Sequence, residues 1–531
     1  MRTLFALAIL LLGFTANAQQ FRTDAIRAHM TFLASDMLEG RGTGSRGHRI
    51  AAEYVAAQYA LAGLEPGANG SWYQEVPFVT TAANEGSTVT LTPRIGAPVN
   101  LKIFDQFVSY GDPLFPQKDF TGDIVVAGYG VTAPTEHYDD YARIDVKGKI
   151  VAIFPGGPKT FPNALRAHHS SSMVKLQNAA AHGAIGLIYL TPPAEAERVP
   201  WERNVRQSRL GSATWLGPDG APRVPDRTIS SAISLNPDTT RLLLGSTADA
   251  TFEALAKGEP KRGALPYRAT VHLISSQKTS VSPNVVGLLR GSDPKLRDEY
   301  IVYSSHLDHL GISAPVEGDA INNGAFDNAS GIAAMLEIAR AFASMPARPR
   351  RSILFLATTG EEKGSKGADY FANNPTVPVD AIAGNINIDM LVMTHRMLDL
   401  VAYGAETNDL GDIARDVAKQ MHIELSPDPF PQEMVFVRSD QYAFVRRGIP
   451  AIYLNPGFKA ADPNVNGEAE FARWLRTRYH SPKDDMQQPI DWPAALLLTE
   501  FDYRLGLAAA NRDARPQWKP GDFFGQTFAR R

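Results

Sequence analysis

Two adjacent carboxylates, Glu361 and Glu362, follow the short apolar run 353–357 and a Thr-Thr-Gly tripeptide. Carboxylates held this close in a confined site repel each other unless a cation or a shared proton relieves them. One of the pair could ligate a metal ion while the other works as a base. The alternative is a solvated acidic turn, so the residues elsewhere in the chain must decide.

A histidine and an aspartate stand at the end of another apolar segment. His306 and Asp308 follow residues 300–303 and are two positions apart, so on an extended strand they share a face. The carboxylate can then lie beside the imidazole, since a metal-bound histidine normally donates its other ring N–H to such a group, or both can point into one site. His309 falls on the opposite face, and we expect it to pack rather than to ligate.

Three more candidates stand at the ends of predicted elements. Asp327 precedes a segment with a helical apolar stripe, and its alternative role is to cap that helix, for which Asn328 or Ser330 would also serve. Asp389 ends the apolar run 384–390, where a charge usually needs a partner. His480 lies in a turn-like segment, and a surface histidine is its alternative.

Together these residue types indicate one kind of chemistry. Two imidazoles and three carboxylates suit two zinc ions, and a fourth carboxylate remains as a base. The chain has no cysteine, which excludes thiolate ligands and disulfides. The histidines disfavour an all-oxygen magnesium or calcium site.

The elements that must position these residues are those of an α/β protein. Apolar runs predict strands at 284–289, 300–303, 353–357, 384–390 and 448–454, and helical patterns occur at 24–35, 48–62 and after residue 330. Ligands of open α/β sheets collect beyond the carboxyl ends of strands, where the candidates stand.

Two other stretches contain residues that could bind a ligand, but we interpret both without a binding site. The Gly-rich segment 39–44 is predicted to be a mobile loop, and it lacks the Lys-Ser/Thr ending of a phosphate loop. Residues 112–265 read as a small β-rich module with strands at 122–130, 146–154 and 184–189 and a helix at 173–182. We interpret its His168-His169 pair as structural, because no acidic cluster accompanies it.

The N-terminus has the pattern of a secretion signal. Arg2 precedes the apolar run 4–14, and Ala16-Asn17-Ala18 has the small-x-small form of a cleavage site. We expect residues 1–18 to be removed and the mature chain to be exported to the periplasm or secreted, free of the membrane; an uncleaved anchor is the alternative. The net charge of −3 gives no electrostatic argument for nucleic acid, and 531 residues predict two or three domains.

The chain resembles the co-catalytic zinc aminopeptidases, the superfamily of bacterial leucyl aminopeptidases, glutamate carboxypeptidase II and the transferrin receptor. The resemblance rests on five motifs in order: His306-Leu-Asp-His-Leu-Gly311, Gly324-Ala-Phe-Asp-Asn-Ala-Ser-Gly331, Thr359-Gly-Glu-Glu-Lys-Gly364, Asn387-Ile-Asp-Met390 and Tyr479-His-Ser-Pro-Lys-Asp484. It implies a three-layer α/β domain with a central mixed, mostly parallel sheet flanked by helices. It also implies that residues 19–111 and 266–531 form the peptidase domain and that 112–265 are an inserted protease-associated domain.

The resemblance further implies a role for each candidate. Asp327 would bridge two zinc ions; His306 and Asp389 would complete one site, and Glu362 and His480 the other. Asp308 would be the partner of His306, Glu361 the general base, and the Asp327–Asn328 bond would be cis. The implied reaction is hydrolysis of the N-terminal bond of peptides with a free N-terminus.

One departure and three alternatives remain. Gln441 stands where bacterial relatives often have a histidine, which puts substrate preference in doubt. The nearby Arg438 could meet a substrate carboxylate or be solvated. The alternatives are a glutaminyl cyclase with one zinc, a carboxypeptidase or dipeptidase, and a receptor-like protein without catalysis. The sequence predicts neither the preferred residue nor the oligomeric state.

Overall fold

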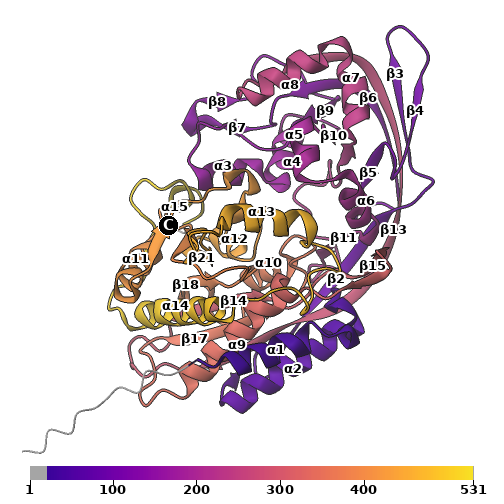
Figure 1. Ribbon diagram of the computed structural model, residues 1–531. Coiled ribbons are helices and arrows are strands. Elements are labelled where there is room, and N and C mark those ends of the chain that lie inside the picture. Colours follow the sequence, from indigo (N-terminus) through magenta and orange to yellow (C-terminus); the bar gives the residue numbers. More distant parts are fainter. Residues whose placement is uncertain (1–20, 530–531) are drawn as a thin grey trace, which may run out of the picture.

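The computed structural model describes residues 21–529, and Figure 1 shows how their helices and strands are arranged. The predicted targeting segment, residues 1–18, lies outside the described residues, so cleavage and export remain predictions. Within residues 21–529, no helix combines the length and apolar character that crossing a bilayer requires.

A mixed sheet, here called the main sheet, occupies the lower part of the molecule in Figure 1. Its strands lie in the order β11, β2, β13, β17, β14, β18, β21, β19 and β20, and β1 pairs with β13. The central strands β17, β14, β18 and β21 are parallel, which confirms the predicted fold class. The bounds are β1 (Glu65–Pro66), β2 (Tyr73–Ala83), β11 (Ser212–Trp215), β13 (Arg262–Leu289), β14 (Tyr300–His306), β17 (Ser352–Thr358), β18 (Ile382–Asn387), β19 (Asp399–Tyr403), β20 (Glu424–Ser426) and β21 (Ala451–Pro456).

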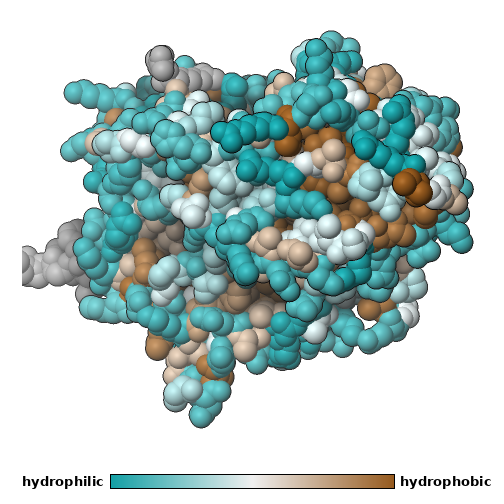
Figure 2. Space-filling model, turned by 90° about the horizontal axis from the view of Figure 1, so that it is seen from above, coloured by the Kyte–Doolittle hydropathy of each residue, from teal (hydrophilic) through white to brown (hydrophobic). Residues whose placement is uncertain are grey.

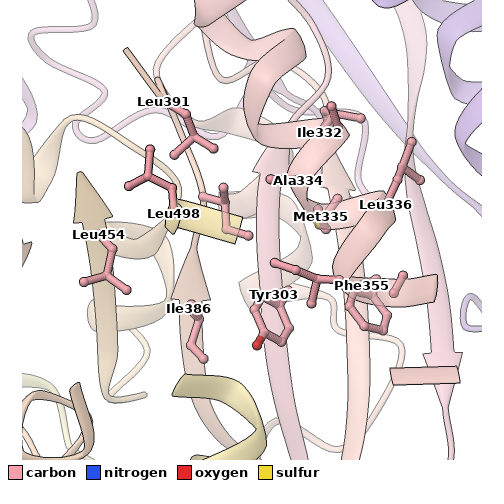
Figure 3. Packing of buried hydrophobic residues seen from close by; sticks show 14 of the residues in the cluster. Tyr303, Ile332, Ala334, Met335, Leu336, Phe355, Ile386, Leu391, Leu454 and Leu498 are labelled. Carbon is pink, nitrogen blue, oxygen red and sulfur yellow. The ribbon is translucent and has the colours of Figure 1, made fainter. Parts of the chain in front are cut away.

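Helices cover both faces of the main sheet, which explains why its central strands are almost continuously apolar. Ile301 and Tyr303 of β14 belong to the larger apolar cluster, whereas Val302 between them belongs to the cluster on the opposite face. Figure 3 shows Tyr303 with Ile332 and Met335 of the covering helix α9. The larger cluster takes in α1 (Thr23–Leu33), α2 (Arg46–Ala62), α9 (Ser330–Ala343), α11 (Leu410–Met421) and α14 (Trp492–Asn511), and the other takes in α10 (Lys366–Asn373) and α12 (Gln441–Val445).

A second sheet lies above the main sheet in Figure 1. Its strands lie in the order β4, β3, β13, β6, β9, β10, β12 and β5. The new bounds are β3 (Thr88–Pro93), β4 (Val99–Lys102), β5 (Phe107–Ser109), β6 (Gln117–Ala127), β9 (Ile150–Ile153), β10 (Gly186–Tyr189) and β12 (Ile233–Leu235). The helices of this region are α3 (Asn163–Ser170), α4 (Ser172–Ala181), α5 (Pro193–Arg198), α6 (Trp201–Leu210), α7 (Pro237–Leu244) and α8 (Ala248–Ala256).

The strand pairing differs from the module boundaries expected at residues 112 and 265. Strands β3, β4 and β5 already belong to the second sheet, and β11 returns to the main sheet by pairing with β2. The physical reason is β13, whose 28 residues pair first in the second sheet and then in the main sheet. A strand shared by two sheets leaves no linker whose composition would mark a boundary.

The surface seen from above, over the second sheet, is mostly hydrophilic, with apolar side chains gathered in one area on the right of Figure 2.

The remaining elements are short or lie at the rim. The elements not yet named are β7 (Thr132–Ala133), β8 (Tyr138–Asp139), β15 (Gly311–Val316), β16 (Asp319–Asn322), α13 (Gly467–Thr477) and α15 (Phe523–Phe528).

The His168-His169 pair lies in α3 and is buried among aromatic rings. The ring of His168 is 5.0 Å from that of Phe523, and its Nδ1 lies 2.6 Å from the hydroxyl of Tyr442. No ion pair of either histidine occurs among the described residues. The surroundings agree with the structural interpretation of this pair.

One buried lysine makes the stability of the second-sheet region depend on pH. Lys175 of α4 is fully buried, and its Nζ donates hydrogen bonds to the carbonyl oxygens of Phe154 at 2.9 Å and Gly156 at 2.6 Å. Burial, opposed by Asp140, lowers the pKa of Lys175 to about 7. In an unfolded chain the pKa of a lysine is about 10.4.

The folded pKa therefore lies below the unfolded one. Between pH 7 and about 10 the unfolded chain binds a proton that the folded chain has released, so the contribution of Lys175 to stability rises with pH. We expect the free energy of unfolding of the wild type to increase relative to Lys175→Met by up to about 1.4 kcal/mol per pH unit in urea titrations over this window. The exposed Lys102→Met is the control, and a wild-type-to-Lys175→Met difference that stays constant with pH would contradict the prediction.

Candidate metal centre

The candidate residues come together at one edge of the main sheet. Strand β14 ends at His306, β17 ends at Thr358 shortly before Glu361, and β18 ends at Asn387 shortly before Asp389. Because these strands are parallel, their carboxyl ends lie at the same edge, where ligands of α/β proteins collect.

Asp327 reaches this edge from η4 (Ala325–Ala329), the irregular turn before α9. Its peptide bond to Asn328 is cis, as the resemblance implied. The Oδ1 atom of Asn328 accepts a hydrogen bond from the N–H of Gly331 at 3.0 Å, in the first turn of α9. Asn328 thus binds a backbone N–H in the first turn of α9, whereas the carboxylate of Asp327 faces the histidines.

The five predicted ligands form two groups that share Asp327. In the first half-site, His306 Nε2 lies 2.9 Å from Asp389 Oδ1 and 3.2 Å from Asp327 Oδ1. In the second half-site, His480 Nε2 lies 3.1 Å from Glu362 Oε2 and 3.3 Å from Asp327 Oδ2. Asp327 thus turns one oxygen to each half-site, which is the arrangement a bridging ligand needs.

The charges of the cluster fit a divalent cation. The side chains of Asp327 and Glu362 are each 3% exposed and that of Asp389 is 7% exposed, and among the described residues no lysine or arginine forms an ion pair with them. Buried carboxylates need a paired positive charge. The Oε1 atom of Glu362 is also buried, and the polar atom beside it is Nδ1 of His309 at 2.6 Å, another potential metal ligand.

The carboxylates favour the protonated, positively charged form of the neighbouring histidines. Burial lowers the pKa of His306, but Asp389 and Asp327 outweigh it and raise this pKa well above its usual value. Burial also acts to lower the pKa of His480, but the carboxylates of Glu362 and Asp327 outweigh it and raise this pKa to about 9. Burial acts to raise the pKa of Asp327, but the surrounding histidines hold it well below the usual value.

The expectation that His309 packs away from the site is wrong. Its Nδ1 lies 2.6 Å from Glu362 Oε1 and 3.9 Å from Asp327 Oδ2, and its ring is 5.9 Å from that of His480. These atoms are close enough for His309, Asp327 and Glu362 to hold one ion. The alternation of faces failed as a guide because β14 ends at His306, three residues earlier.

The predicted pairing of His306 with the carboxylate of Asp308 is also wrong. His306 Nδ1 lies 3.0 Å from the backbone carbonyl oxygen of Asp308, and a hydrogen bond to this oxygen can orient the ring equally well. The carboxylate instead accepts hydrogen bonds from the N–H of Glu361 at 3.0 Å and from the hydroxyl of Thr43 at 2.8 Å. Asp308 therefore positions the Glu361 segment.

Glu361 itself lines a cavity that opens onto the first half-site and His480. Burial is the main reason that the pKa of Glu361 is raised well above its usual value, and the carboxylates of Asp389 and Glu362 add to the effect. A carboxylate whose pKa is raised in this way is suited to accept and return a proton near neutral pH.

The predicted mobile loop at 39–44 is instead an anchor of the site. Arg41 is 1% exposed and donates hydrogen bonds to the carbonyl oxygens of Leu307 at 2.9 Å, Asn323 at 2.7 Å and Gly324 at 3.0 Å. These carbonyls flank His306 and Asp327, so one guanidinium joins the two segments that carry them. Burial lowers the pKa of Arg41 to about 10, which leaves it charged at neutral pH.

A glycine next to Arg41 allows its segment to pack closely against residues 311 and 322. Gly40 has a φ of +67°, and a Cβ atom there would lie 2.5 Å from the carbonyl oxygen of Asn322 and 2.7 Å from that of Gly311. A larger residue would push the Arg41 segment away from the site.

Asp484 holds the segments of Asp327 and His480 together in a similar way. Its Oδ1 accepts from the N–H of Phe326 and its Oδ2 from the N–H of Asp327, both at 3.0 Å. The motif contained Asp484, but its backbone partners are more than 150 residues away in the chain, and the spacing does not reveal them.

The two residues that left specificity open occupy different places. Gln441 is fully buried, accepts a hydrogen bond from Asn387 Nδ2 at 2.9 Å and donates one to the carbonyl oxygen of Phe436 at 2.9 Å. Gln441 therefore holds the side chain of Asn387 at the end of β18 and does not line the cavity. Arg438 lines the cavity, where it is ion-paired with Glu433 at 3.2 Å.

Fold and site together define an α/β protein with a candidate two-metal centre at the carboxyl edge of its main sheet. Residues 284–501, which contain all five predicted ligands, match peptidase family M28.

Individual relatives cover different shares of the chain. A "Probable zinc metalloprotease" of Pyrenophora teres f. teres (strain 0-1) is 37% identical over 107 residues, which are 20% of this chain and 22% of that protein. Human "Transferrin receptor protein 2" is 26% identical over 275 residues, 47% of this chain and 31% of that protein. The chain thus spans between about a fifth and a third of the length of these relatives.

A solved structure shows the same fold over nearly the whole length. The "Aminopeptidase from Aneurinibacillus sp. strain AM-1" matches with a TM-score of 0.54 at 20% identity, covering 93% of this chain and 95% of that one. At this identity the likeness concerns the fold alone.

The role of Arg41 as an anchor predicts the effect of its removal. Arg41→Met would leave three carbonyl oxygens near the site without their charged donor, so we expect a loss of about 2–4 kcal/mol in the free energy of unfolding, measured by urea titration. Arg46→Met is the control, because that side chain is 74% exposed. Equal stability of the two variants would show that the 39–44 segment does not hold the site.

Proposed function

We propose that this protein is an exported aminopeptidase that holds two zinc ions and hydrolyses the N-terminal bond of peptides. The observation that carries the proposal is the pair of buried half-sites that share Asp327 and have no lysine or arginine partner among the described residues. The match of residues 284–501 to peptidase family M28 supports a peptide as the substrate.

The residue types favour zinc as the metal. His306 and Asp389 would hold one ion, Glu362 and His480 the other, and Asp327 both. When bound, two zinc ions supply a water of lowered pKa and polarise the carbonyl of the scissile bond. His309 lies close enough to Glu362 to orient that carboxylate or to join it as a ligand.

Glu361 is the proposed general base. It lies beside the half-sites without belonging to either, and its N–H is held by Asp308. It would take a proton from the attacking water and return it to the leaving amine. Its raised pKa, caused mainly by burial, supports the second of these transfers because it makes the protonated form accessible.

The cavity beside the site favours an apolar side chain at the substrate N-terminus. Its lining includes Met390, Phe430, Val435, Phe471 and Leu475. Such side chains gain free energy by burying another apolar group, about 25 cal/mol per Å². We therefore propose that leucine and phenylalanine are preferred over glycine and over charged residues.

The same lining argues against a carboxypeptidase. Among the described residues that line the cavity, Arg438 is the only guanidinium or ammonium group, and it is already ion-paired with Glu433. A substrate carboxylate would have to compete with that pair. A glutaminyl cyclase and a receptor-like protein remain the alternatives that the following measurements separate.

A panel of aminoacyl reporter substrates tests the proposal directly. We expect the mature protein to release leucine and phenylalanine fastest, to lose activity when a chelator removes the metal, and to regain it with zinc. Each chain should bind two zinc ions, measured by elemental analysis. Formation of pyroglutamyl ends without hydrolysis would identify a cyclase, and inactivity of the zinc-loaded protein on every peptide would support a receptor.

The base is tested by a substitution that keeps its shape. Glu361→Gln should retain two zinc ions and lose about 10²–10⁴ of kcat, since the amide cannot accept the proton. Glu468→Gln, an exposed change in the first turn of α13, is the control. Full turnover by a zinc-loaded Glu361→Gln protein would remove Glu361 from this role.

A further inference from the structure

A helix of the second-sheet region reaches the second half-site. Gln207 of α6 places its side-chain amide nitrogen, Nε2, 2.5 Å from Nδ1 of His480. The other ring nitrogen of His480 faces Glu362 at 3.1 Å and Asp327 at 3.3 Å. The imidazole is therefore held between a residue of α6 on one side and the two carboxylates on the other.

Two further contacts fix α6 in this place. Arg203, which is 8% exposed, donates hydrogen bonds to the carbonyl oxygens of Leu475 and Arg476 at 3.0 Å each. These carbonyls lie at the end of α13, a few residues before His480. The contacts tie α6 to the segment that carries the histidine.

The other end of α6 is tied to the segment that carries Glu362. Lys363 donates hydrogen bonds from Nζ to the carbonyl oxygens of Leu210 at 3.1 Å and Gly211 at 3.2 Å. Leu210 is the last residue of α6. The carbonyl groups at this end of the helix, which have no partner within it, therefore accept hydrogen bonds from Lys363, the residue next to Glu362. A single helix thus contacts the segments that carry His480 and Glu362.

The backbone of His480 has an uncommon conformation. Its φ of +55° is a conformation that residues other than glycine rarely adopt. The ring stacks on that of Tyr479 at 3.7 Å, but stacking leaves rotation within the ring plane undetermined. A hydrogen bond to Nδ1 removes that freedom.

We propose that Gln207 is a positioning residue that aims His480 at the metal, so that α6 makes the second half-site depend on the second-sheet region. The inference rests on the proposed two-metal centre. A metal-bound histidine normally hydrogen-bonds through its other ring nitrogen, and its partners affect metal affinity by about 10–100-fold. The amide of Gln207 has both a donor and an acceptor atom. With a metal on Nε2 of His480, Nδ1 carries the proton, so the amide turns over from the orientation seen here and its oxygen accepts the N–H of Nδ1.

This chemistry predicts different effects for two substitutions of similar size. Gln207→Met removes the acceptor and should weaken one of two zinc equivalents by about 10–100-fold, while the other keeps its affinity. Gln207→Glu retains an acceptor oxygen and should bind both equivalents about as tightly as the wild type. Gln177→Met, which removes a glutamine of α4 from the same region, is the control.

The measurement is a zinc titration of the metal-free mature protein against a chromogenic chelator, with cobalt absorption spectra of each variant as a second readout of ligand geometry. Loss of one equivalent in Gln207→Met with recovery in Gln207→Glu supports the proposal. Two unchanged equivalents in Gln207→Met, or equal losses in both variants, would overturn it. If Gln207→Met does not fold, as judged by its thermal unfolding, Gln207→Asn takes its place with the same two outcomes, because its shorter amide cannot reach Nδ1.

The zinc content of the wild-type protein distinguishes a failure of the Gln207 proposal from a failure of the proposed function. A wild-type protein that binds fewer than two zinc ions contradicts the proposed function. A wild type with two zinc ions and an unaffected Gln207→Met variant leaves the proposed function intact and removes only the role of Gln207.

Discussion

The burial of several carboxylates without a compensating basic side chain is the constraint that governs this structure. Asp327, Glu362 and Asp389 are almost completely withdrawn from water, and their close neighbours among the described residues are imidazoles. Such a cluster is stable only with positive charge at its centre. The carboxylates raise the pKa values of His306 and His480, and the same charge distribution favours a bound cation.

Around that cluster, long side chains join loops that the sheet alone would not align. Parallel strands bring His306, Glu361 and Asp389 to one edge, but Asp327 and His480 lie on separate connections. Arg41 and Asp484 hold those connections through backbone carbonyl and N–H groups. Because hydrogen bonds of charged groups to backbone are directional, they fix the distances between half-sites that apolar packing would leave loose.

The second-sheet region contributes contacts that hold the metal centre together. Strand β13 runs through both sheets, and β11 pairs with β2 of the main sheet. Helix α6 then contacts the segments of Glu362 and His480 directly. The second half-site therefore depends on contacts from both regions.

The sequence by itself determined the residue types and the strand ends. Apolar runs such as 353–357 predict buried strands, and a charged residue soon after one is expected at the edge of the sheet. The α/β fold and the approximate place of His306, Glu361, Glu362 and Asp389 could therefore be predicted. The tertiary structure decided the partners. His309 turned toward Glu362 once the strand had ended, the carboxylate of Asp308 bound Glu361 instead of His306, and the contacts of Arg41 and Gln207 join residues more than 250 positions apart. Local patterns hold information about neighbours along a strand or helix, whereas these contacts depend on how separate elements pack in three dimensions.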